Sequence, residues 1–225
     1  MTLSRYYLLL PIFLLSFYFF PQYRRPAVVS VPLPHRANAT FYMLARNSDL
    51  EGALATIVQV EKRINRNLGY PYVLLNDVPF ENQFMDAIRA STTSKVEFGL
   101  IPPEQWNQPE WIDEIKAAAE RQKMAAAGVK YGDSISYRNM CRFNAGSRSP
   151  QFFFQHPLML KYRWYWRLEP NVKYHCNVDF DPFLFMQENN KTYSFTIATY
   201  EDPSTIPSLW STVRGMFGNH SALRL

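Results

Sequence analysis

One short stretch of the chain places arginine, glutamate and large aromatic residues side by side. Residues 162–169 read YRWYWRLE, so Arg167 is followed two positions later by Glu169. An arginine guanidinium binds a diphosphate through planar, bidentate hydrogen bonds. A carboxylate beside it can hold a hard metal ion that bridges the same phosphates. The same residues also fit an ordinary half-buried strand that ends in an ion pair, and composition alone favours this second interpretation.

A second candidate metal site has the spacing Asp-x-Asp, at Asp179 and Asp181. In a strand, residues i and i+2 face the same side, so the two carboxylates can share a cation. Asp181 followed by Pro182 is also a good helix start, because aspartate caps a helix and proline fits its first position. We favour the helix start. The four histidines fit no metal spacing, and a zinc site at His175 and Cys176 lacks further ligands.

The cysteines and glycosylation sequons bear on the compartment of the protein. Cys141 and Cys176 either pair in an oxidising lumen or remain as two buried free thiols, and the sequence leaves both interpretations open. Sequons for N-glycosylation begin at Asn38, Asn190 and Asn219. Such sequons arise readily by chance, so they give only weak support for a lumenal location.

The surrounding chain alternates between strand-like and helix-like segments. Strands are predicted over residues 40–45, 70–75 and 95–100, and helices over residues 49–67, 81–90 and 109–124. This alternation predicts an α/β fold with a largely parallel sheet. Ligands of such sheets bind beyond the carboxyl ends of the strands, which places Arg46-Asn47 and Asn76-Asp77 at the expected rim. Each of these residues also fits the simpler role of a turn or helix cap.

The charge distribution excludes one class of partner. Three of the five net positive charges lie in residues 1–25, at Arg5, Arg24 and Arg25, which leaves +2 for the remaining 200 residues. A nearly neutral globular part lacks the basic face that nucleic-acid binding requires. Apolar residues make up 47% and aromatic residues 16% of the chain, which is ample for the core of one medium-sized domain.

The amino terminus predicts a membrane anchor. Residues 6–23 are uncharged and largely apolar or aromatic, and their 18 residues suffice for a thin membrane of the early secretory pathway. A cleaved signal peptide is the alternative, but no small-x-small cleavage site follows, and Arg24-Arg25 lies where cleavage would be expected. We therefore predict a cytoplasmic tail at 1–5, a signal-anchor at 6–23, an extended stem at 24–37 and a lumenal domain at 38–225.

Eight stretches resemble, in the same order, the fungal α-1,2-mannosyltransferase family of glycolipid and glycoprotein synthesis. They are ANATFYMLARNSDL, YPYVLLNDVPF, PEWIDEIKAAAERQKM, YGDSISYRNMCRFN, YWRLEP, VDFDPF, NNKTYSFTI and TIPSLW, which span residues 37–212. The resemblance implies a nucleotide-sugar-binding α/β fold of the glycosyltransferase A type with a mixed sheet. It also implies a type II Golgi membrane anchor, GDP-mannose as donor, Mn2+ as metal, and retaining transfer to the 2-hydroxyl of a mannose-terminated glycan acceptor.

The resemblance also assigns site residues. Glu169 of YWRLEP matches the metal-binding glutamate of the family, and Arg167 matches the arginine that precedes it. Tyr137 of YRNMCRF matches a tyrosine near the donor phosphates. Arg46 of LARNSDL matches the arginine after the first strand, close to the nucleotide. Glu201, ahead of TIPSLW, matches a carboxylate of the sugar pocket.

Two departures from the family pattern affect this assignment. Residues 144–151 contain about five more residues than the family usually has between R-F and S-G-F-F. If that loop faced the donor site it would displace Tyr137, whereas a surface bulge is the simpler interpretation. Asn171 stands where many relatives carry an acid, which removes one possible second carboxylate.

The family resemblance also implies that the fold is truncated at its carboxyl end. Family members continue well beyond Leu225, and their proposed nucleophile and the histidine that completes the metal site lie in that stretch. No catalytic residue is therefore expected within this chain, which we expect to be an amino-terminal part. The leading alternative is an inactive, membrane-anchored lumenal protein that binds glycans or partners. A secreted structural glycoprotein is a third hypothesis.

Overall fold

The computed structural model describes residues 35–145 and 153–217. The predicted cytoplasmic tail, the anchor at residues 6–23, most of the stem and the sequon at Asn219 lie outside these residues. The chain divides into two units, Met1–His35 and Arg36–Leu225, and the fold below is that of the second unit. Among the described helices, none combines the length and apolar character needed to cross a membrane.

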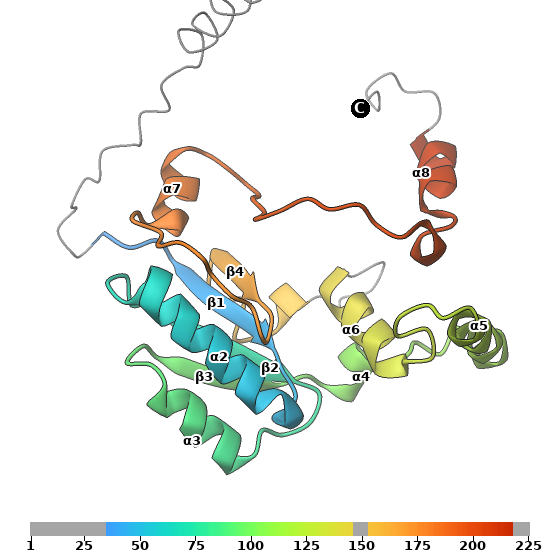
Figure 1. The fold of residues 1–225 in the computed structure, drawn as a ribbon, viewed down its shortest axis with the longest axis horizontal. Coiled ribbons are helices and arrows are strands. Elements are labelled where there is room, and N and C mark those ends of the chain that lie inside the picture. Colours follow the sequence, from blue (N-terminus) through green and yellow to red (C-terminus); the bar gives the residue numbers. More distant parts are fainter. Residues whose placement is uncertain (1–34, 146–152, 218–225) are drawn as a thin grey trace, which may run out of the picture. The chain divides into compact units, whose positions relative to one another are not determined.

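A parallel sheet forms the centre of this unit (Figure 1). Its strands are β1 (Ala39–Leu44), β2 (Tyr72–Asn76), β3 (Val96–Leu100) and β4 (Trp164–Leu168), in the order β3-β2-β1-β4. Every strand pair is parallel, with Met43 of β1 beside Leu74 of β2 and Leu168 of β4. The predicted α/β fold is therefore confirmed. The antiparallel strand that a mixed sheet requires is not found in residues 35–145 and 153–217.

The strand sequences agree with their positions in the sheet. The central strands β1 and β2 are almost wholly buried and read as near-continuous apolar runs, as expected where helices cover both faces. The edge strand β4 alternates between partly buried and exposed residues until the buried Leu168. This is the half-buried strand predicted from YRWYWR, displaced by two residues.

One face of the sheet is covered by α2 (Leu50–Val60), α3 (Asn82–Ala90) and α7 (Pro182–Glu188). Successive residues of a strand point to opposite faces, and Phe41 of β1 points to this one. Phe41 belongs to the same buried cluster as Ile57 and Ile88, and its ring lies 5.5 Å from that of Phe183.

The long helix predicted over residues 49–67 is interrupted. A 3-10 helix (Asn47–Asp49) precedes α2, and a π-helical turn (Glu61–Asn65) follows it. The buried side chain of Asn65 accepts a hydrogen bond from the main-chain nitrogen of Tyr70 (2.7 Å) and donates to its carbonyl (2.9 Å). These bonds satisfy the main chain of the turn that leads into β2.

The opposite face is covered by α4 (Pro103–Trp106), α6 (Ile135–Ala145) and a 3-10 helix (Phe153–Gln155). Tyr42 of β1 points to this side and stacks on Phe153, with ring centroids 4.7 Å apart. Trp106 and Phe143 belong to the same buried cluster. Neither α4 nor α6 was predicted.

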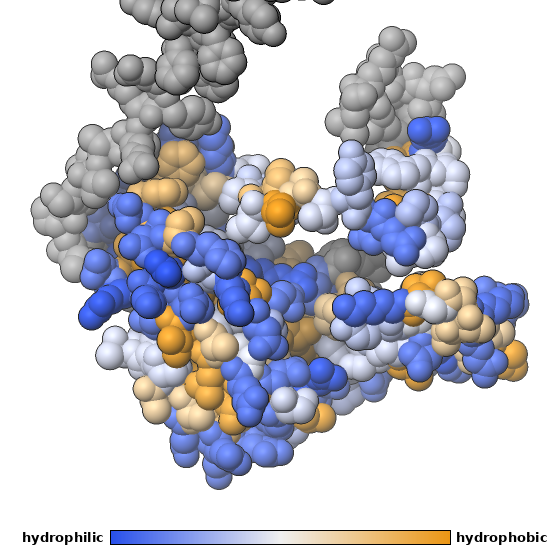
Figure 2. Space-filling view, in the orientation of Figure 1, coloured by the Kyte–Doolittle hydropathy of each residue, from blue (hydrophilic) through white to orange (hydrophobic). Residues whose placement is uncertain are grey.

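The remaining helices are α5 (Glu114–Ala126), a 3-10 helix (Pro203–Thr205) and α8 (Leu209–Phe217). Helix α5 begins later than the predicted Pro109, because the Asp113 carboxylate caps it by accepting from the main chain of Ile115 and Lys116. Ile115 is strongly exposed, and Figure 2 shows apolar surface among hydrophilic side chains in this region.

Cys141 and Cys176 are free thiols, and both are exposed. The structure therefore matches neither of the two interpretations that the sequence left open, a disulfide or two buried thiols. Cys141 lies on α6 and Cys176 in the segment after β4.

Candidate functional site

A pocket of about 340 Å³ lies at the carboxyl ends of β1, β2 and β4, beside the start of α6. Its polar lining includes Arg46, Asp49, Asn76, Asp77, Tyr137 and Glu169. The rim position predicted for Arg46 and for Asn76-Asp77 is confirmed. Asn47 has the simpler role of a cap, since its side chain donates to the carbonyl of Pro79 and accepts from the nitrogen of Glu81.

Arg46 is held by Asp49 at the entrance to α2. Its Nε and Nη2 atoms each lie 3.1 Å from a carboxylate oxygen of Asp49, and its main-chain nitrogen donates to the same carboxylate at 2.9 Å. Burial raises the pKa of Asp49, but the hydrogen bonds from Arg46 outweigh burial and lower it overall. The Arg46 side chain remains 63% exposed. An oriented, accessible guanidinium is suited to binding an anion.

Asn76, the last residue of β2, lines the pocket and carries an unpaired donor. The residue is 1% exposed. Its Oδ1 accepts from the main-chain nitrogen of Asp77 at 2.9 Å, which fixes the orientation of the amide. Its buried Nδ2 has no hydrogen-bond partner in the described part of the chain. A buried donor left without a partner costs free energy, so a ligand oxygen or nitrogen at this point would be stabilised.

Arg167 and Glu169 lie at the end of β4. Their side chains form an ion pair, and Glu169 lines the pocket together with Pro170. Arg167 is not among the lining residues. The predicted proximity of the two residues is confirmed, and the guanidinium contacts the carboxylate of the pocket-lining Glu169.

Two tyrosines form one wall of the pocket. The rings of Tyr131 and Tyr137 are stacked, with centroids 4.7 Å apart and planes inclined by 22°. The neighbouring Cys141 is the largest influence that raises the pKa of Tyr137, followed by burial and by the charge of Glu201. Tyr137 thus lies in the pocket despite the extra residues at 144–151. Most of that insertion falls outside the described residues.

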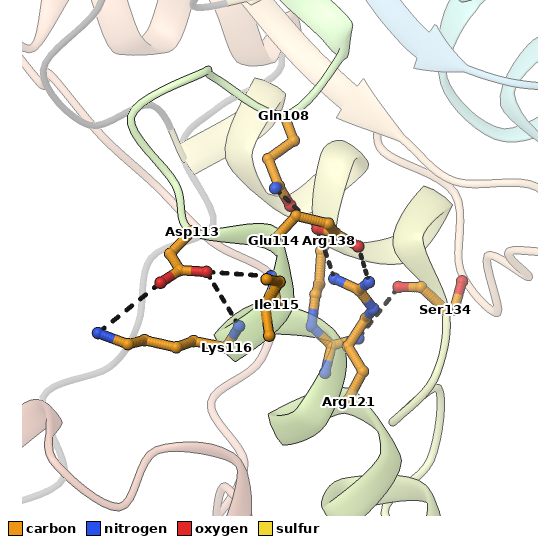
Figure 3. Close-up of polar contacts among 8 residues, drawn as sticks. All are labelled: Gln108, Asp113, Glu114, Ile115, Lys116, Arg121, Ser134 and Arg138. Atoms are coloured by element: carbon orange, nitrogen blue, oxygen red, sulfur yellow. Dashed lines mark hydrogen bonds and ion pairs between the residues drawn. The ribbon is translucent and has the colours of Figure 1, made fainter.

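The turn before α6 is held by hydrogen bonds between its own residues and those of α6, which Figure 3 shows beside the ion pair of α5. The main-chain nitrogen of Tyr137 lies 3.1 Å from the Ser134 hydroxyl, and Arg138 donates to the carbonyl of Ser134. Within α5, Arg121 pairs with Glu114. The hydrogen bonds of Ser134 fix the segment that presents Tyr137 to the pocket.

Glu201 does not line the pocket. Its carboxylate accepts from the main-chain nitrogen of Asp202 and from the hydroxyl of Thr205, each at 3.0 Å, at the start of the 3-10 helix Pro203–Thr205. In this structure Glu201 therefore acts as a local cap, and its link to the site is limited to its electrostatic effect on Tyr137.

The Asp-x-Asp pair has the structural role that we favoured. Asp181 caps α7, since its Oδ1 accepts from the main-chain nitrogens of Phe183 (3.0 Å) and Leu184 (3.1 Å). Its other carboxylate oxygen accepts from the Tyr70 hydroxyl at 2.6 Å. Asp179 is exposed and does not line the pocket.

The metal-ligating groups of the site are few. In residues 35–145 and 153–217, no three His, Cys, Asp or Glu side chains gather closely enough to hold a metal ion by themselves. Glu169 offers one accessible carboxylate in the pocket. Manganese and magnesium prefer oxygen ligands, and magnesium is commonly held by one or two carboxylates together with phosphate oxygens and water. The residues present therefore fit a cation shared with a bound diphosphate.

Comparison with known proteins identifies the fold and its family. Residues 23–223 match the family described as glycolipid 2-alpha-mannosyltransferase. The chain belongs to this family. It is 46% identical over 188 residues to the alpha-1,2 mannosyltransferase KTR1 of Saccharomyces cerevisiae, covering 84% of this chain and 47% of that protein. It is 44% identical over 196 residues to the O-glycoside alpha-1,2-mannosyltransferase omh1 of Schizosaccharomyces pombe, covering 87% and 49%.

Two solved structures share this fold. The mannosyltransferase Ktr4p of S. cerevisiae in complex with GDP superposes with a TM-score of 0.78 at 41% identity, over 84% of this chain and 47% of that one. Core-mannan synthase A of Aspergillus fumigatus, in its Mn/GDP form, has a TM-score of 0.78 at 35% identity, over 85% and 50%. The chain thus spans about half the length of these family members.

Proposed function

We propose that this chain carries the donor-binding part of a retaining α-1,2-mannosyltransferase that uses GDP-mannose. The observation that supports it best is that Arg46, Tyr137 and Glu169, matched to the family by separate motifs, line one pocket beyond the carboxyl ends of the strands. This is where α/β sheets bind nucleotides. Family membership and the GDP complex of a relative with the same fold support the same ligand.

In this proposal the pocket binds the nucleoside diphosphate. Arg46 supplies an accessible, oriented guanidinium for a phosphate or the nucleoside, and the Tyr131–Tyr137 stack provides a flat wall. Glu169 would hold Mn2+ jointly with the diphosphate, and Arg167 would add a second positive charge behind it. Bound there, the cation supplies Lewis acidity toward the phosphate oxygens. Glu201 would join the sugar pocket only if its segment moved from the position described.

The protein groups would act mainly on the charge that develops as GDP departs. Arg46 and Arg167 place positive charge near the diphosphate, and fixed charges of this kind stabilise a leaving group without reorganisation. Burial of Asn76 beside the pocket leaves its Nδ2 ready to donate to the bound ligand. The acceptor would be a mannose-terminated glycan on a glycoprotein or glycolipid, whose 2-hydroxyl receives the mannose.

The proposed location rests on the amino-terminal sequence rather than on the fold. We propose that residues 6–23 anchor the protein in the Golgi membrane as a single-pass type II segment, with the domain in the lumen. The uncharged apolar run and the absence of a cleavage motif after it support this topology.

Calorimetry with the whole protein tests the donor site. GDP should bind more tightly with Mn2+ than without it, and UDP and ADP should bind more weakly than GDP under the same conditions. Equal binding of all three nucleotides, or no binding, would refute the proposal. Incubation with labelled GDP-mannose and an α-mannoside acceptor then separates an active enzyme from the alternative of an inactive binding protein, which would bind GDP without transferring mannose.

A further inference from the structure

The turn that carries Glu169 is hydrogen-bonded to one face of α2. The Thr56 hydroxyl donates to the main-chain oxygen of Glu169 and accepts from the main-chain nitrogen of Val172, both at 2.9 Å. Thr56 is fully buried, so these two contacts replace hydrogen bonds to water. The one hydroxyl therefore fixes the backbone at both ends of the turn, at Glu169 and at Val172.

Gly52, one helical turn earlier, holds the middle of the same turn. The main-chain nitrogen of Asn171 donates to the Gly52 carbonyl at 3.0 Å. Asn171 has a φ of 65°, in the left-handed region that asparagine tolerates. Its amide packs so closely on α2 that a Cβ at Gly52 would lie 2.5 Å from the Asn171 Nδ2. Residues i and i+4 of a helix share a face, so α2 holds the turn through hydrogen bonds from two successive helical turns, at Gly52 and Thr56.

Helix α2 also leads to the other side of the pocket. It follows directly on Arg46 and Asp49, which are joined to each other and line the pocket. The rise and hydrogen bonding of an α-helix fix the spacing of its residues. The contacts of Gly52 and Thr56 therefore set the position of Glu169 relative to Arg46.

We propose that Thr56 is a positioning residue for Glu169, which it holds at the point where a cation shared with a diphosphate is bound. This inference rests on the proposed function. The side chain of Glu169 is 50% exposed and contacts the 40% exposed side chain of Arg167, so its placement depends on the backbone beneath it. Groups that orient a metal ligand in this way commonly change metal affinity by 10- to 100-fold when removed.

The test compares Thr56→Val, which keeps the shape but removes the hydroxyl, with Thr56→Ser, which keeps the hydroxyl. Calorimetry measures GDP binding with and without Mn2+, and paramagnetic resonance measures the fraction of Mn2+ bound in the presence of GDP. In Thr56→Val we expect the enhancement of GDP binding by Mn2+ to fall about tenfold, with metal-free GDP binding unchanged. Thr56→Ser should retain the enhancement of GDP binding by Mn2+.

Thr40→Val is the matched control for lost stability. Thr40 is also fully buried, and its hydroxyl donates to the carbonyl of Pro71 at the opposite end of the sheet from Glu169. We expect Thr40→Val to lower the melting temperature as Thr56→Val does but to leave the Mn2+ enhancement intact. An unchanged enhancement in Thr56→Val, or an equal loss in Thr40→Val, overturns the positioning role. If the unmodified protein itself shows no enhancement, the proposed function fails, and the positioning role fails with it.

Discussion

Arg167 and Glu169 form an ion pair at the end of β4 in which the arginine side chain is 40% exposed and the glutamate side chain 50% exposed. A pair with this much access to solvent contributes only about 0–1 kcal/mol to stability. Each of the two side chains can therefore give up its partner for a ligand atom at little cost in free energy. This suits a site that binds a charged diphosphate.

Arg167→Lys tests this interpretation of the pair. Lysine keeps the positive charge but loses the planar, forked arrangement of donors that matches phosphate oxygens. We expect GDP affinity to fall while the free energy of unfolding changes by less than about 1 kcal/mol. Calorimetry and urea denaturation measure the two quantities. Unchanged GDP binding would show that Arg167 serves only the ion pair.

Asn76→Asp tests the unpaired donor of the pocket. Aspartate has nearly the same shape and keeps an oxygen for the Asp77 nitrogen, but it replaces the buried Nδ2 donor with an acceptor. GDP should bind at least about tenfold more weakly, equivalent to about 1.4 kcal/mol. As control, Asn47→Asp alters an amide that contacts Pro79 and Glu81 rather than the pocket and should leave GDP binding unchanged. Equal GDP affinity in both variants would contradict a role for Asn76 in the site.

The close packing of Asn171 on Gly52 predicts that Gly52→Ala lowers the free energy of unfolding. In Gly52→Ala the new methyl group meets the Asn171 side chain at less than van der Waals distance, and overpacking of this kind typically costs about 1–3 kcal/mol. Adding Asn171→Gly removes the obstructing side chain, and glycine accepts the φ of 65°. Denaturation should therefore show that the double variant recovers most of the stability that Gly52→Ala loses. A double variant less stable than Gly52→Ala would disprove this packing account.

The burial of His156 predicts how the free energy of unfolding depends on pH. It is buried, its Nδ1 accepts from the main-chain nitrogen of Leu158, and its Nε2 lies 3.2 Å from the carbonyl of Leu100, so the ring is neutral. Burial lowers its pKa below the usual 6.5, and the contact with Leu100 offsets this only in part. The unfolded chain therefore binds the proton more readily than the folded one. Stability should be full above the unfolded pKa and fall as the pH drops below it, by at most about 1.4 kcal/mol per pH unit.

Denaturation between pH 5 and 7.5 measures this dependence, with His156→Asn as the test variant. The slope in this range should be shallower in His156→Asn than in the unmodified protein. The exposed His175 provides the control, and His175→Asn should leave the slope unchanged. An identical slope in all three proteins would remove His156 as its cause.

The core strands and the rim of the site could be predicted from sequence because their signals are local. Apolar bursts such as TFYMLA mark buried strands, and the rule that ligands bind beyond strand ends placed Arg46 and Asn76 in the pocket. The helix cap of Asp181 was equally visible, since Asp-Pro before an apolar run is a local pattern. What could be read locally was predicted correctly, to within a few residues.

The contacts between distant segments could not be predicted in this way. Thr56 and Glu169 lie 113 positions apart, and nothing in the spacing of α2 indicates that its buried threonine supports the turn after β4. Helix α6 was not predicted, although it presents Tyr137 to the pocket. Glu201 was expected in the sugar pocket by resemblance, whereas its position here is set by a cap of its own 3-10 helix.

The most direct measurement is the binding of GDP with and without Mn2+ to Glu169→Gln and to Asp179→Asn. Glu169 lines the pocket, whereas Asp179 lies outside it, next to the capping residue of α7. We predict that Glu169→Gln abolishes the enhancement of GDP binding by Mn2+ and that Asp179→Asn leaves it intact. Loss of the enhancement in Asp179→Asn alone would place the metal at the Asp-x-Asp pair and contradict the site described here.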